Sequence, residues 1–334
     1  MRLIICFLIC FISIFSKAQS RQYYNQYMLN PGFFNPANMD IYTKYGGTMQ
    51  YSNDFAGQGI SPTSMALYGH YNRRGLQGFG GTIINDYFGG YNQLEVAANY
   101  AYKKWAPLGN ICYSFGVRVG MMQQSLNTTE LYYPSKVKDG VLDPVLMEPK
   151  LAKIGLNMGF GFAMVTKDFD LNFSMPGLIA NRMPSNGDST RTSLFDFSNN
   201  NFFLSAGYKI RMDDSWYVFY PTFMLKGAFG APVHAGLDLN YLMNQMVYAS
   251  IGARSDLSLV ANVGIFLDAG WRFVYTYQNH LLTQHPGSGY SHEISIGYAR
   301  TLPESPFKFR KFMTTSGEFK KPTIKERVIR WLNK

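Results

Sequence analysis

Cysteine is scarce in this chain, and long apolar runs are missing from most of it. Two of its three cysteines lie within the first ten residues, and Cys112 is alone in the rest. No stretch after the first residues approaches the run of about eighteen uncharged apolar residues that a transmembrane helix needs. If the protein lies in a membrane, it must therefore cross it with the strands of a β-barrel.

The first residues have the pattern of a secretory signal peptide. Arg2 gives a basic start, Leu3–Phe15 is apolar, and Ser16-Lys17-Ala18 is a small-residue ending. We expect residues 1–18 to be removed by cleavage before Gln19. The mature chain then has one cysteine, which excludes an intramolecular disulfide and a cysteine metal cluster.

The sequence also lacks the short motifs of common enzyme classes. It has no helical His-Glu-x-x-His, no Gly-x-Ser-x-Gly and no phosphate-binding P-loop. Glycines near 78–81 and 155–161 lie in strand-like segments, whereas a dinucleotide fingerprint needs a strand, a turn and a helix. We therefore expect no enzymatic activity, no cofactor and no bound metal. A hydrolase with a site built from scattered strand ends is the alternative from the enzyme class.

Alternation of bulky apolar residues with small or polar ones is the most prominent pattern in the chain. In residues 153–165, isoleucine, leucine, methionine and phenylalanine fall on one face, and glycine, asparagine and alanine on the other. A period of two predicts a strand with lipid on one side and a lumen on the other. The predicted fold class is therefore all-β, an antiparallel outer-membrane β-barrel. About fourteen such segments occur, near residues 45–52, 63–72, 78–85, 92–102, 112–122, 153–165, 168–175, 201–211, 215–225, 232–242, 246–254, 258–266, 268–278 and 290–300.

The connections between these segments give an independent test. If the first strand starts in the periplasm, the turns that follow the second, sixth, eighth, tenth and twelfth strands are periplasmic, and all are tight. The long connections, roughly 123–152 and 176–200, then lie together on the outside, as outer-membrane barrels prefer. The sequence thus predicts an N-terminal lead-in over 19–44, a barrel over 45–300 and a periplasmic C-terminal tail over 301–334.

The tail carries most of the excess positive charge, which is formally +10 for the whole chain. Residues 308–334 hold nine Lys or Arg but only two acidic residues. Because no basic patch interleaves with the strands, we expect no nucleic-acid partner. Thr323-Ile324-Lys325-Glu326 predicts a capping box that opens a short amphipathic helix, which would bind a periplasmic partner or the anionic inner leaflet unless it stays solvated. The candidate contact residues of the tail are Lys325, Arg327, Val328, Arg330 and Trp331.

Charged residues inside the predicted strands fall on the polar face. We expect them to form an internal salt-bridge network that fixes the strand register and fills the lumen. A solute-selective pore lining is the alternative. The residues concerned are Glu95, Arg118, Asp238, Arg272 and Glu293.

The lead-in contains two Asn-Pro steps among aromatic residues. Proline disfavours the helical conformation of the residue before it, so this segment is predicted to be extended and kinked. It would pack on the barrel rim or contact a partner. Asn30, Pro31, Asn35 and Pro36 are therefore candidate partner-binding residues.

A series of short motifs carries a family resemblance through the N-terminal third. They are Gln26-Tyr27-Met28-Leu29-Asn30-Pro31, Asn35-Pro36-Ala37, Gln50-Tyr51, Pro62-Thr63-Ser64 and the glycine-rich stretch from Gly78 to Asp86. With these motifs the chain resembles the PorP/SprF family of type IX secretion system membrane proteins. One departure is Ser52-Asn53-Asp54-Phe55 after Tyr51, where the family commonly has an Arg-x-Gln-Trp-like stretch.

The resemblance implies an outer-membrane barrel needed for the secretion or surface display of cargo proteins such as gliding adhesins. It also implies contact with periplasmic secretion or gliding machinery, besides the outer-membrane lipids around the barrel. It supplies no catalytic residues. An outer-membrane porin or hydrophobic-solute transporter is the alternative from the transport class.

Overall fold

The structure, a computed structural model, describes residues 24–40, 43–56, 61–73, 76–106, 111–127, 150–180, 201–212, 217–228, 233–244, 246–267, 270–281 and 289–301. The predicted signal peptide and the tail beyond residue 301, with all its candidate contact residues, lie outside this part of the chain. Among the described residues, no helix has the length and apolar character needed to cross a membrane.

Strands make up nearly all of the described chain. A single 3₁₀ turn, η1, covers Pro31–Phe33, and the strands are β1 Thr43–Ala56, β2 Thr63–Arg73, β3 Gln77–Phe88, β4 Tyr91–Trp105, β5 Ile111–Asn127, β6 Lys150–Thr166, β7 Phe169–Ala180, β8 Asn201–Tyr208, β9 Ile210–Met212, β10 Tyr217–Ala228, β11 His234–Met243, β12 Val247–Arg254, β13 Ser258–Phe266, β14 Trp271–His280 and β15 Tyr290–Thr301.

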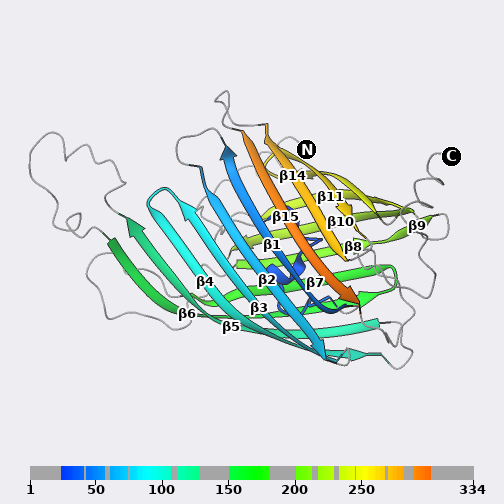
Figure 1. Ribbon diagram of the computed structural model, residues 1–334, viewed down its shortest axis with the longest axis horizontal. Coiled ribbons are helices and arrows are strands. Elements are labelled where there is room, and N and C mark those ends of the chain that lie inside the picture. The colour runs from blue at the N-terminus through cyan, green and yellow to red at the C-terminus, as the bar shows by residue number, and fades with distance from the viewer. Residues whose placement is uncertain are drawn as a thin grey trace, which may run out of the picture.

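The strands close into a ring (Figure 1). Apart from β8 and β9, which do not pair with each other, neighbouring strands in sequence pair antiparallel, and β15 pairs with β1. β8 and β9 form one crossing interrupted at Lys209, since both pair with β10. The result is a closed antiparallel barrel of 14 strands, so the predicted fold and strand number are confirmed.

Several strands are longer than the sequence predicted. β5 and β6 have 17 residues each and project beyond the rest of the wall in Figure 1. The connection between them therefore begins after Asn127 and ends at Lys150, rather than covering 123–152. Strand ends that flank the two longest connections lie together at one end of the barrel, and the tight turns, such as β6–β7 and β11–β12, lie at the other.

Side chains alternate between the two faces of the wall in most strands, and β12 shows the pattern without interruption. In β12, Val247 and Ile251 are exposed, while Tyr248 and Arg254 between and beside them are buried. Ile251 is 60% exposed. A continuous ring of exposed aliphatic side chains is stable when hydrocarbon surrounds it, and a closed ring leaves no strand edge unpaired in that hydrocarbon.

Aromatic side chains gather on the outer face near the tight-turn end. The rings of Phe79 and Tyr100 lie 5.4 Å apart between centroids, and those of Trp271 and Tyr298 lie 5.0 Å apart. Such a girdle marks the level where the hydrocarbon meets the headgroups. At the other end, Tyr277 stacks on Tyr290 at 5.7 Å.

The N-terminal segment lies inside the barrel, so the interpretation that it packs on the rim was wrong. Figure 1 shows this segment, in blue, within the ring of strands. Its side chains and carbonyls bond to β2, β4, β5, β11 and β14, which face one another across the lumen. A ring of 14 strands is wider than the rings of about eight strands that wall side chains can fill alone.

We predict that a charge placed on the lipid face destabilises the barrel by an amount that increases with the depth of the charge in the membrane. Val119 lies in the middle of β5 on that face and is 45% exposed. Val119→Arg should lower the free energy of unfolding by about 2–4 kcal/mol, and Gln123→Arg, near the end of the same strand and face, by about 0–1 kcal/mol. Urea unfolding in lipid vesicles measures both, and equal costs would contradict the membrane position.

Candidate functional site

Residues 24–40 fill the lumen, and we call them the plug. Tyr27 is 2% exposed and Phe33 1%. The ring of Phe34 stacks on Phe203 of β8 with centroids 5.1 Å apart, and Tyr24 lies 5.5 Å from Phe33. The plug therefore packs its aromatic side chains against buried apolar and aromatic side chains of the wall, in a lumen that also carries many buried polar groups.

The Asn-Pro steps give the plug its turns. Pro31 opens η1, where its missing N–H costs nothing. The carbonyl of Pro31 accepts from the backbone N–H of Asn35 at 2.8 Å, and the Asn35 side chain in turn accepts from Ala37 N at 2.9 Å. Within the described residues, every backbone-to-backbone hydrogen bond of the plug joins residues three or four apart. The plug thus holds its path without adding a strand to the wall.

Wall side chains bind the main-chain carbonyls of the plug. Such bonds satisfy the backbone acceptors of the plug inside the barrel. The donors are Arg118 to Gly32 and Phe33 (3.1 and 2.9 Å), Arg272 to Leu29 (2.9 Å), Ser114 to Ala37 (2.7 Å), Lys103 to Met39 (2.8 Å) and Asn72 to Met39 and Asp40 (3.0 and 2.8 Å).

Two ion pairs stand in the lumen wall behind the plug. Arg118 lies 3.7 Å from Glu95, and both side chains are fully buried. Arg254 lies 2.8 Å from Asp238. Asp238 also accepts from the Tyr27 hydroxyl at 2.7 Å. Burial, and then the charge of Asp238, raise the pKa of Tyr27 well above its usual value, so the phenol stays a neutral donor.

Arg272 and Glu293 contact the plug rather than each other. Arg272 donates to the side chains of Asn30 and Thr48, at 2.9 and 2.8 Å, besides the Leu29 carbonyl. Glu293 accepts from the backbone N–H of Asn25 at 2.8 Å. The charged residues picked out from sequence therefore form one ion pair among themselves, Glu95 with Arg118, and otherwise bond to Arg254 or to the plug.

The four candidate residues of the Asn-Pro steps lie inside their own barrel, where Asn30, Asn35 and Pro36 are buried and Pro31 is half-buried. Asn35 donates to the carbonyl of Phe162 at 2.9 Å, and Asn30 donates to Gln50 at 3.3 Å. Pro31 and Pro36 lie within the same segment. In this structure, then, these residues contact the barrel wall.

Lys103 is a lumen residue that the sequence reasoning missed. It is 0% exposed and bonds to Asn72 at 2.6 Å as well as to Met39. Its position in the strand identifies it as a lumen residue. Lys103 lies an even number of residues from Glu95 and Asn99 in β4 and so faces the same side of the wall.

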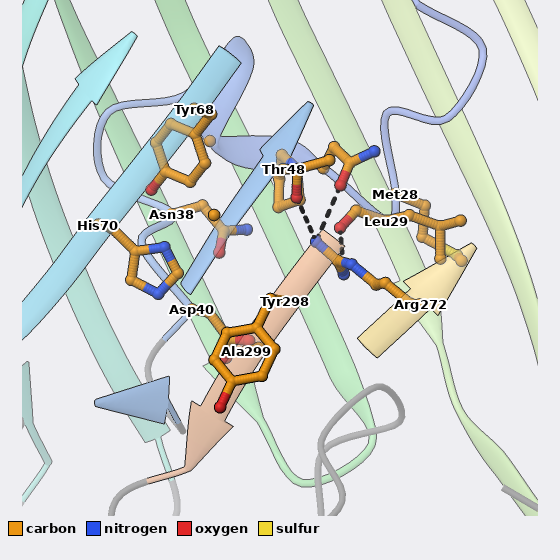
Figure 2. A pocket seen from close by; sticks show the side chains of 14 residues that line it. Met28, Leu29, Asn38, Asp40, Thr48, Tyr68, His70, Arg272, Tyr298 and Ala299 are labelled. Atoms are coloured by element: carbon orange, nitrogen blue, oxygen red, sulfur yellow. Dashed lines mark hydrogen bonds between the residues drawn. The ribbon is translucent and has the colours of Figure 1, made fainter. Parts of the chain in front are cut away.

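A small cavity remains beside the plug (Figure 2). Its volume of about 30 Å³ holds about one or two water molecules. Plug residues 28–32 line it together with Tyr68 of β2, Arg272 of β14 and neighbouring parts of β1 and β15. The Tyr68 hydroxyl is buried without a hydrogen-bond partner in the described structure, so a water molecule fits there.

Among the described residues, no group of three or more His, Cys, Asp or Glu side chains could hold a metal ion. The described contacts of the site are polar and aromatic ones between the wall and residues 24–40.

A family model described as type IX secretion system membrane protein PorP/SprF matches residues 16–298. The chain belongs to the PorP/SprF family. Family membership implies association with the type IX secretion machinery, and together with the barrel it places this PorP/SprF protein in the outer membrane.

Solved barrels are similar to this PorP/SprF chain at low sequence identity. The outer membrane protein Omp33 of Acinetobacter baumannii is 5% identical with a TM-score of 0.44, and the alignment covers 78% of this chain and 99% of that one. The CymD monoaromatic hydrocarbon channel is 10% identical with a TM-score of 0.48, over 86% and 95%. No curated protein matches the chain.

We predict that the buried pair of Arg118 and Glu95 is energetically coupled. Arg118→Met removes the cation beside the buried Glu95 carboxylate and should cost about 3–5 kcal/mol of unfolding free energy. The double variant with Glu95→Gln should recover more than about 1 kcal/mol of that loss. Urea unfolding of the purified variants measures both, with Arg300→Met on the exposed face of β15 as control. A cost for Arg118→Met equal to that control would contradict the described contacts.

Proposed function

We propose that this protein is an outer-membrane docking barrel of type IX secretion, which supports the secretion or surface display of cargo such as gliding adhesins without being the pore they cross. Membership of the PorP/SprF family supports the link to secretion. The filled lumen supports the second part of the proposal, that cargo proteins do not cross the membrane through this barrel. A cargo chain needs the space that the plug occupies.

The plug is the observation that carries this proposal. Wall groups around the ring hold it, including Glu293 at Asn25, Asp238 at Tyr27 and Lys103 at Met39. Releasing it would break these bonds together and expose the aromatic cluster around Phe203. Passive diffusion through the native barrel is therefore disfavoured, and the same filled lumen argues against a porin.

Contact with partners would then use the two ends of the barrel. β15 ends at Thr301 at the tight-turn end, where the C-terminal tail begins. We propose that this end faces the periplasm and that the tail, through Lys325, Arg327, Val328, Arg330 and Trp331, contacts the secretion or gliding machinery. A basic segment there would attract an acidic partner in a salt-dependent way.

The proposed role assumes no enzymatic turnover. Buried polar groups of the lumen already have partners: Arg118 donates to the Phe33 carbonyl of the plug, and Asp238 accepts from Tyr27 of the plug and from Arg254 of the wall. These bonds hold the plug and the wall in place.

We predict that deletion of the gene abolishes the surface appearance of one or more large secreted proteins and leaves permeability to small solutes unchanged. Surface labelling and antibiotic uptake measure the two effects. Expression of the wild-type chain from a plasmid should restore display and serves as the control. Normal display together with lost uptake of a solute would instead favour the transporter.

A further inference from the structure

The barrel wall is complete without the plug. β1 pairs with β2 and β15, and β10 pairs with β8 and β11, so the ring closes through strand pairing alone. The plug bonds to this ring through side chains, and its own backbone-to-backbone bonds in the described structure are local. The plug therefore has the geometry of a bound segment inside a finished receptor.

Much of the recognition is directed at the main chain. Arg118, Arg272 and Lys103 donate to plug carbonyls at 2.8–3.1 Å. Main-chain carbonyls are common to every polypeptide, so these donors recognise the path of the chain. Side-chain selectivity is added at Asn35, whose amide reaches Phe162 O, and at Tyr27, whose hydroxyl reaches Asp238.

Two wall glycines provide space for a polypeptide backbone. A Cβ on Gly116 of β5 would overlap the backbone of Pro36 and Ala37, and a Cβ on Gly161 of β6 would overlap the Asn35 side chain. Because the second Asn-Pro turn lies directly on these glycines, the wall there fits a main chain closely.

Two buried ion pairs of the lumen do not depend on the plug, and Arg272 and Lys103 keep the wall acceptors Thr48 and Asn72 when the plug leaves. Arg118 keeps Glu95, and Arg254 keeps Asp238, since both carboxylates belong to the wall. Water can hydrate the remaining polar groups, whereas an apolar lumen would have no such substitute for its ligand.

We propose that the lumen is a binding site for a polypeptide segment with aromatic residues and Asn-Pro turns, and that it accepts such a segment from a separate chain when its own residues 24–40 are withdrawn. The ligand class is a kinked, extended peptide that presents its carbonyls to Arg118, Arg272 and Lys103. This site is separate from the contacts at the barrel ends in the proposed function.

The test begins with the full-length protein carrying a protease site between Asp40 and Thr43. The protein is folded and purified before cleavage, so folding does not depend on the cut. A synthetic fluorescein-labelled peptide of residues 22–40 is then added in mild urea that releases the cleaved fragment, and its anisotropy is followed. We expect saturable binding to cleaved protein and no binding to uncut protein.

Matched variants separate the lumen from other surfaces. Gly116→Val should weaken peptide binding about ten-fold or more, because valine occupies the place of the peptide backbone. Gly81→Val, on the exposed face of β3, should leave binding unchanged, because the atom nearest to an added Cβ is Ala97 O at an ordinary contact distance of 3.9 Å. A scrambled peptide of the same composition should not compete.

A second measurement does not require release of the cleaved fragment. Cleaved full-length protein is unfolded in urea and refolded with excess labelled peptide, which should be incorporated in competition with the original fragment. Failure of the labelled peptide to bind in both formats, or equal binding by the scrambled peptide or by Gly116→Val, would overturn the proposal. Because purified protein is used, this outcome is independent of the secretion phenotype.

Discussion

The need to pair every backbone polar group within hydrocarbon is the constraint from which the rest of this structure follows. Strands satisfy it only when their sheet closes, so β15 returns to β1. Closure with 14 strands creates an interior wider than the wall side chains can fill. Residues 24–40 fill that interior, and the aromatic cluster and the ion pairs of the lumen form around them.

The lumen combines apolar packing with charge because both are needed to hold one segment in one position. Aromatic contacts such as Phe34 on Phe203 bury apolar surface but do not by themselves fix the position of the plug along the wall. Arg118 and Arg272 donate to particular carbonyls and so fix the register of the plug. Burying these charges is costly unless they are paired or hydrogen-bonded, and Glu95, Asn99 and Asn30 provide that compensation.

The wall was predictable from sequence because period-two alternation is a local signal. The position of the plug could not be predicted in this way, since its partners are scattered over the whole chain. Even in the wall, the break at Lys209 was missed, where the side chain turns to Asp170 at 2.6 Å. For the plug, one signal was available. No charged residue occurs between Arg21 and Asp40, which is unusual for a segment exposed at a rim. The charged residues of the lumen were identified by their place in the period-two alternation. Their pairing could not be predicted, because it depends on strand register and on the path of the plug.

The central claim, that the protein's own N-terminal segment closes the barrel, is tested most directly by single-channel recording in planar bilayers. The native protein should show no stable open steps. Gly116→Val, which forces the plug from its place, should show them, and Gly81→Val should stay closed like the native chain. Large steady conductance of the native protein, indistinguishable from that of Gly116→Val, would contradict a plugged lumen and return the protein to the class of diffusion porins.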